Sequence, residues 1–170
     1  MTEIVNRIKN SSLIQMDLKD FIPEKQIKVF DLKFGLINEM ILKEKEFRSY
    51  INQYDWSQYN DSFVSIICSV DAIIPTWSFM LVSSELSKRG IESHVLSEEE
   101  VYKLLIIEKI KNYPIEKLLH GKIIIKGCSE IKYPSFALSE LVKKIQPKVD
   151  SIMYGEPCST VPIYKKRIKK

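Results

Sequence analysis

The chain has 170 residues, of which 45% are hydrophobic and 28% charged, with a net charge of +4. This balance is typical of an ordinary globular protein with its own core, and it argues against a disordered or membrane-spanning chain. Residues 1–12 mix charges and lack the apolar stretch of a secretory signal, and three cysteines is an odd number for a disulfide framework. The sequence therefore predicts a cytoplasmic protein with free thiols.

Residues 1–60 are predicted to form an N-terminal α+β extension packed on the rest of the chain. The segment "LIQMDLKDF" predicts an extended stretch, residues 31–38 the start of a short helix, and residues 43–56 a longer helix. No stretch rich in Pro, Gly or Ser precedes Asp61, so nothing there indicates a linker. We therefore expect a single domain overall.

Residues 61–164 are predicted to form an α/β core. Short β-rich segments alternate with helical patterns, and the predicted strands cover residues 62–68, 91–97, 122–127 and 149–155. Helix-start signals fall between them, at Pro75, at the capping-box residue Ser97 and at Pro134. Because strands alternating with helices favour right-handed parallel units, we expect a three-layer, mostly parallel, Rossmann-like sheet in the order β-α-β-α-β-α-β.

Two stretches of this core are alike. The segments "IICSVDAIIPTWSFMLVSSEL" and "IKGCSEIKYPSFALSEL" both run from a strand through Cys-Ser and a proline into a helix. An internal duplication and a chance match between two β-α units both fit this likeness.

The net charge comes from the end of the chain. Five of the 26 Lys and Arg fall in residues 165–170, and the remaining 21 are balanced by 22 Asp and Glu. A solvated tail and weak binding to phosphate or an acidic partner both fit this pattern. Nucleic-acid binding is not expected, because basic residues are not spread over a folded face.

Each cysteine follows or closes a predicted strand and is followed by a serine. Cys68, Cys128 and Cys158 should therefore lie on one edge of a parallel sheet, where neighbouring strands are about 4.8 Å apart. Thiolates at this spacing suit zinc or iron, including an iron–sulfur species. The proposed site adds two carboxylates as a possible fourth ligand and three serines that would hydrogen-bond the thiolates: Asp71, Glu156, Ser69, Ser129 and Ser159.

Two other interpretations of the cysteines stay open. One of them could be a single reactive thiol, or all three could pack as small hydrophobic residues. The histidines are weak candidates, since His94 lies on a predicted strand and His120 in a turn at the opposite edge. The sequence contains no Cys-His dyad, GxGxxG, GxxxxGK[ST] or CxxC motif, so nucleotide binding through the known loops is not supported.

The segments "DWSQY", "CSVDAIIPTW", "KGCS" and "SIMYGEPCSTVPIYK" resemble an uncharacterised bacterial family of unknown function. The resemblance runs from "EIVNRI" to the tail, and "GEPCSTVP" is its most specific motif. It implies proximity to iron–sulfur cluster assembly genes, and hence an accessory role with iron–sulfur assembly proteins as partners. It brings no assigned catalytic residues.

Three functions follow from these observations. The first is binding of zinc, iron or an iron–sulfur species by the three cysteines. The second is a thiol-dependent enzyme of sulfur transfer or redox chemistry, in which one cysteine carries a persulfide or disulfide and another resolves it. The third is a non-catalytic interaction protein whose tail meets an acidic partner. A homodimer is compatible with each, and no membrane partner is expected.

Overall fold

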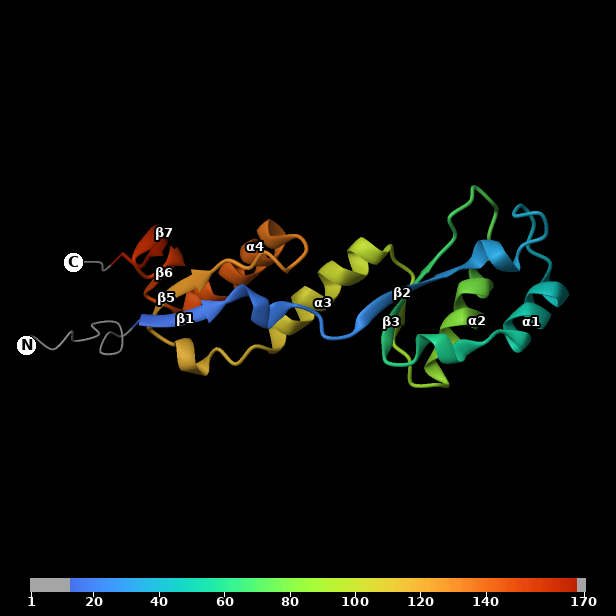
Figure 1. Cartoon of the computed structure of the whole chain (residues 1–170), viewed down its shortest axis with the longest axis horizontal. Helices are drawn as coiled ribbons and strands as arrows, with labels where there is room; N and C mark the ends of the chain where they lie inside the picture. The colour runs from blue at the N-terminus through green and yellow to red at the C-terminus, as the bar shows by residue number, and fades with distance from the viewer. Residues whose placement is uncertain (1–12, 168–170) are drawn as a thin grey trace, which may run out of the picture. The chain divides into compact units, whose positions relative to one another are not determined.

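The strands of this chain divide between two sheets (Figure 1). The computed structural model describes residues 13–167. Its contacts separate two units, one made of the chain up to Pro23 together with Lys103 onward, and the other of Glu24–Tyr102. The boundaries thus differ from those expected at residues 60 and 164, because each sheet takes its first strand from the N-terminal segment.

The first unit contains a four-stranded sheet in the order β1-β5-β6-β7. Its strands are β1 (Leu13–Asp17), β5 (Lys122–Lys126), β6 (Ser151–Glu156) and β7 (Ser159–Lys165). The first three are parallel, and β7 returns antiparallel to β6 through a tight turn. The side chains Ile123, Ile124 and Ile125 are all buried, so β5 is covered on both faces of the sheet.

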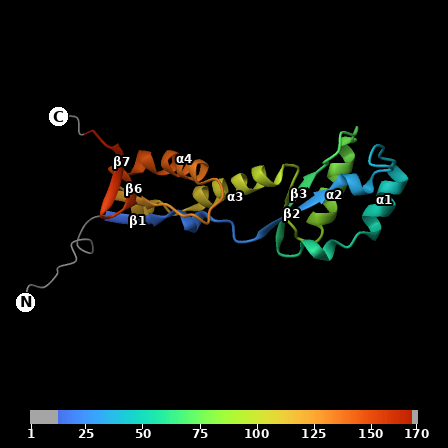
Figure 2. The same ribbon diagram turned by 45° about the horizontal axis from the view of Figure 1, so that its top comes forward.

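The second unit contains a three-stranded parallel sheet in the order β2-β3-β4. Its strands are β2 (Gln26–Asp31), β3 (Ser62–Ile67) and β4 (Ser93–His94), and β2 and β3 run side by side in both views (Figures 1 and 2). Its core is rich in aromatic residues. The Phe30 ring stacks on Trp56 with centroids 5.3 Å apart, and Tyr54 meets the same ring edge-on at 5.1 Å.

Four α-helices lie within residues 13–167: α1 (Glu44–Gln53), α2 (Thr76–Ser87), α3 (Glu98–Asn112) and α4 (Pro134–Ile145). The capping box predicted for α3 is present, with Glu100 Oε2 accepting from Ser97 N at 2.8 Å and Ser97 Oγ accepting from Glu100 N at 3.3 Å. Pro134 occupies the first turn of α4, where its missing N–H costs nothing.

The described part of the chain also contains five short 3-10 helices: η1 (Leu18–Phe21), η2 (Leu32–Gly35), η3 (Trp56–Tyr59), η4 (Glu116–Leu118) and η5 (Gln146–Lys148).

The predicted order of elements along the chain is found between β3 and β6, but the predicted single sheet is not. β3 and β4 pair with each other and β5 pairs with β6, while no described pairing joins β4 to β5. The helix α3 lies between these two strands in sequence. A β-α-β pattern specifies alternating elements, whereas the neighbour of each strand is decided by contacts between distant segments. The mixed α/β class is therefore confirmed, and the Rossmann-like arrangement is not.

The two units share one local arrangement. β1 and β2 each end at an aspartate that is followed by Leu-Lys, and in both cases that leucine, Leu18 or Leu32, is fully buried. β1 pairs in parallel with β5 and β2 with β3, and each of those partners leads through Cys-Ser and a proline into a helix, α4 or α2. The likeness thus extends to N-terminal strands outside the two similar segments, which favours duplication over a chance match.

Candidate functional site

Two of the three cysteines lie at one edge of the first sheet. Cys128 comes two residues after β5, and Cys158 lies in the turn that follows the neighbouring strand β6. Because β5 and β6 are parallel, both residues are at the carboxyl ends of their strands. Cys158 is exposed and Cys128 is partly buried, and neither forms a disulfide.

The segment "GEPCS" around Cys158 forms a β-hairpin turn. Glu156 pairs with Ser159, which leaves Pro157 and Cys158 as the two residues of the turn. Gly155 adopts φ +121°, and a Cβ there would come within 2.5 Å of the Ser159 carbonyl oxygen. Gly155 and Pro157 thus allow the chain to reverse direction, and Cys158 lies at the tip of the resulting turn.

The loop after β5 lies close to β6. The Lys126 ammonium is 3.0 Å from the Glu156 carboxylate, and a Cβ at Gly127 would lie 2.6 Å from the hydroxyl oxygen of Tyr154. The absence of a side chain at position 127 therefore allows the Tyr154 hydroxyl to lie over the backbone that leads to Cys128. These contacts connect the segments that carry the two thiols.

Cys68 belongs to the second unit, where its loop is attached to the neighbouring strand end. Asp31, the last residue of β2, accepts hydrogen bonds from the backbone N–H groups of Ser69 (3.1 Å) and Lys33 (3.1 Å). Burial acts to raise the pKa of Asp31, but bonds from the Ser69 side chain and from the two N–H groups, with the Lys33 charge, hold that pKa below its ordinary value. The Cys68 thiol donates to the Val70 carbonyl oxygen at 3.5 Å.

The expectation that three thiols share one sheet edge is wrong, because Cys68 follows a strand of a different sheet from the strands before Cys128 and Cys158. In residues 13–167 no group of three or more His, Cys, Asp or Glu side chains is placed to hold a metal ion. Binding of zinc, iron or an iron–sulfur species therefore stays a prediction.

Of the other predicted site residues, Glu156 and Ser69 contact groups other than the thiols. Glu156 pairs with Lys126, and Ser69 with Asp31. Asp71 is exposed and lies five residues before α2, whose capping position is Pro75, so it does not cap that helix. Ser129 and Ser159 are both exposed beside their cysteines. That these serines tune a thiolate stays a prediction.

A cluster of tyrosines from the end of α1 to the end of η3 is structural. The Tyr54 and Tyr59 hydroxyls are 3.0 Å apart, and Tyr59 donates to the Val29 carbonyl oxygen at 3.2 Å. Burial, with Tyr54 and Asp31 nearby, raises the pKa of Tyr50 to about 12. Burial and the bond to Tyr54 raise the pKa of Tyr59 still further. Both side chains are therefore neutral at physiological pH; Tyr59 belongs to the core and Tyr50 packs against it.

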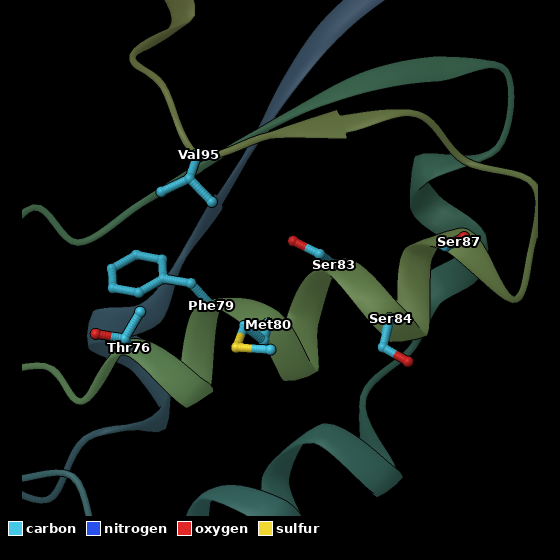
Figure 3. A pocket seen from close by; sticks show the side chains of 7 residues that line it. All are labelled: Thr76, Phe79, Met80, Ser83, Ser84, Ser87 and Val95. Carbon is cyan, nitrogen blue, oxygen red and sulfur yellow. The ribbon is translucent and has the colours of Figure 1, made fainter.

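One pocket of about 600 Å³ lies beside α2 (Figure 3). Val95 faces side chains of the helix that are apolar or carry a small hydroxyl, and the lining consists of Thr76, Phe79, Met80, Ser83, Ser84, Ser87 and Val95. None of these residues is charged, so the pocket itself provides no acid or base. The thiol loops of the first unit are the better site for chemistry.

Sequence reasoning missed a second cavity, at the opposite edge of the first sheet. His120, set aside because of its position in a turn, lines this cavity together with the start of the basic tail. β7 lies outside the four predicted strands, although "STVPIYK" contains the β-branched residues Thr160, Val161 and Ile163. That composition was the available signal. His94 lies on a strand as predicted.

No described helix combines the length and apolar character that crossing a membrane would require. The sequence profile of the family described as "Protein of unknown function (DUF2480)" matches residues 2–166, so the chain belongs to that family. No curated protein and no solved structure matches the chain.

Proposed function

We propose that this DUF2480 protein is a thiol-dependent protein in which Cys158 and Cys128 react with a sulfur–sulfur bond of another molecule. The supporting observation is the placement of an exposed thiol at the tip of the β6–β7 turn, at the same sheet edge as the loop that carries a second thiol. The ion pair between Lys126 and Glu156 connects the two segments. Cys68, in the other unit, takes no part.

The reaction is thiol exchange in two steps. The Cys158 thiolate attacks the S–S bond of a disulfide or persulfide, one sulfur leaves as a thiolate, and a bond forms between Cys158 and the other sulfur. The Cys128 thiolate then attacks Cys158 Sγ and displaces that second sulfur as a thiolate or hydrosulfide. The chain is left with an internal disulfide, and the substrate has gained two electrons.

This proposal keeps the sulfur part of the expected function and gives no role to a resident metal. A persulfide on an iron–sulfur assembly protein is a substrate of the right class, and a cytoplasmic location suits thiols that must stay reduced. Binding of zinc or iron through Cys128 and Cys158 is the competing proposal, and the same protein samples can test it.

The decisive experiment uses 5,5′-dithiobis(2-nitrobenzoate), an aromatic disulfide, on the full chain carrying Cys68→Ser. We expect the aromatic thiol to be released twice per chain and the protein to end as an internal disulfide without adduct, as seen by mass spectrometry. With Cys128→Ser added, the adduct on Cys158 should persist, because the resolving thiol is gone. With Cys158→Ser instead, the Cys128 thiol should react more slowly.

Persistent adducts on both cysteines of the Cys68→Ser protein would overturn the proposal. Elemental analysis of protein purified without oxygen or chelator tests the competing metal site. Stoichiometric zinc or iron that is lost in both Cys128→Ser and Cys158→Ser would favour a metal site instead. Circular dichroism of each variant checks that the fold is retained.

A further inference from the structure

A cavity of about 720 Å³ lies at the edge of the first sheet where β5 and β6 begin and β7 ends. Most of its lining is basic, and the complete set is His120, Lys122, Asp150, Ser151, Lys165, Lys166 and Arg167. All of these residues belong to the first unit. The cavity exists because β7 is antiparallel, which returns the end of the chain to the start of β5 and β6.

Strand register places three of the lining residues in one row. Lys122 is the partner of Ser151 across β5 and β6, and Ser151 is the partner of Lys165 across β6 and β7. Directly paired residues project to the same face of a sheet, so Lys122 and Lys165 lie on either side of Ser151 on one face. Regular strand pairing, rather than a free loop, sets the spacing of these groups.

Backbone hydrogen bonds hold the rest of the lining in place. Asp150 N donates to the Gly121 carbonyl oxygen at 3.0 Å, and Lys166 N donates to the Asp150 carbonyl oxygen at 2.8 Å. His120 N donates to the Lys148 carbonyl oxygen at 2.9 Å, and His120 itself adopts φ +57°, a conformation that L-residues seldom take. The start of the basic tail is thus attached to the sheet.

The charges of this cavity are unbalanced. Lys122, Lys165, Lys166 and Arg167 supply four positive charges, and the carboxylate of Asp150 is the one acidic group of the lining. Its oxygen lies 3.7 Å from the His120 ring and 3.9 Å from the Lys166 ammonium. Lys122 and Lys165 have no carboxylate partner among the described residues.

We propose that this cavity binds the phosphate groups of a small phosphorylated molecule. A phosphate monoester carries nearly two negative charges and three strong acceptor oxygens, which suit several Lys and Arg donors beside a serine hydroxyl. The volume is within the range of small-molecule sites, about 300–1,000 Å³, and exceeds what one phosphate fills. Nucleic acid fits less well, because the basic groups converge on a hollow instead of following a strand.

Isothermal titration of the full chain with inorganic pyrophosphate tests the proposal. We expect saturable binding of one pyrophosphate per chain. Lys122→Gln combined with Lys165→Gln should weaken it by about tenfold or more, since two charge-assisted contacts are lost. The matched control is Lys143→Gln, because Lys143 is an exposed residue of the same unit that pairs with Glu140 outside the cavity. It should leave the affinity unchanged.

A variant that binds pyrophosphate more tightly excludes misfolding as the cause of the altered affinity. Asp150→Asn removes the one competing carboxylate and keeps the backbone bonds, so the affinity should rise about two- to fivefold. Equal losses in Lys143→Gln and in the double variant would overturn a defined site. So would tighter binding of a single-stranded oligonucleotide than of pyrophosphate. Cys128→Ser should bind normally, which separates this test from that of the thiol proposal.

Discussion

The two units start from the same local sequence and use it differently. In the second unit Asp31 accepts from Ser69 N at 3.1 Å and so attaches the Cys68 loop to the end of β2. In the first unit the corresponding Asp17 contacts Lys19, and Gly127 adds one residue between β5 and its cysteine. One inserted glycine therefore accompanies the change from an anchored cysteine loop to one that lies under Tyr154.

The cores of the units differ as well. The second is built around Phe30, whose ring meets those of Trp56, Tyr54 and Tyr59. The first is built on the isoleucines of β5, with Phe21 contacting Tyr113 at 5.3 Å. Both tryptophans of the chain, Trp56 and Trp77, lie in the second unit, so tryptophan fluorescence reports on that unit alone.

The largest loss of stability is expected from truncating a buried aromatic side chain in the core of either unit. Phe30→Ala and Phe21→Ala each truncate a ring that is 1% exposed, and each should cost about 3–5 kcal/mol of unfolding free energy. If the units unfold separately, Phe30→Ala lowers the urea midpoint seen by tryptophan fluorescence. Phe21→Ala should then leave the fluorescence midpoint unchanged and lower the urea midpoint measured by circular dichroism. Equal shifts of both signals in both variants would show that the units unfold as one.

A smaller loss of stability is expected from replacing Asp17 or Asp31, the corresponding aspartates that end β1 and β2. Asp31→Ala should cost about 1–2 kcal/mol, because two backbone N–H groups lose their acceptor beside a side chain only 11% exposed. Asp17→Ala should cost less than about 1 kcal/mol, since that side chain is 35% exposed. Urea unfolding measures both variants, with Asp31→Asn as the control that keeps an acceptor.

The difference in stability between the wild type and Asp31→Ala should decrease as the pH falls. The folded-state pKa of Asp31 is lowered, so its stabilisation is present above the ordinary value of 3.8 and is lost as the pH falls through the folded value. The gap between wild type and Asp31→Ala should therefore narrow in acid. A gap that stays constant with pH would contradict the role given to the carboxylate.

The smallest effect concerns the tyrosine cluster of the second unit. Burial raises the pKa of Tyr50 from 10.0 to about 12, so this side chain stays neutral in the folded state at a pH where the unfolded chain ionises it. The stabilisation is complete below pH 10 and is lost as the pH rises towards about 12. Tyr50→Phe should make the alkaline decline in the fluorescence-detected midpoint less steep. An identical decline in both proteins would exclude Tyr50 as a contributor.

Short-range signals predicted many elements of this fold. The capping box at Ser97 and Glu100, Pro134 in the first turn of α4, and the β-branched run before Gly127 all specify structure through neighbouring residues. The stretch "LIQMDLKDF" is extended as predicted over Leu13–Asp17 but continues as the 3-10 helix η1, and the helix predicted within residues 43–56 is found as α1. β2 and β7 were missed, since each gains most of its order from pairing with a distant strand.

The candidate sites show the same division. The sequence alone determined that cysteines follow β3 and β5 and that positive charge gathers at the end of the chain, because those facts concern residue order and local propensity. Only the tertiary structure decided that Cys68 lies in a different sheet from Cys128, and that Lys165 faces Ser151 and Lys122 across paired strands. The physical reason is that a strand pairs with the neighbour that lets both bury their apolar faces, and the two strands can be far apart in the sequence. The alternation of strands and helices along the chain carries no information about that choice.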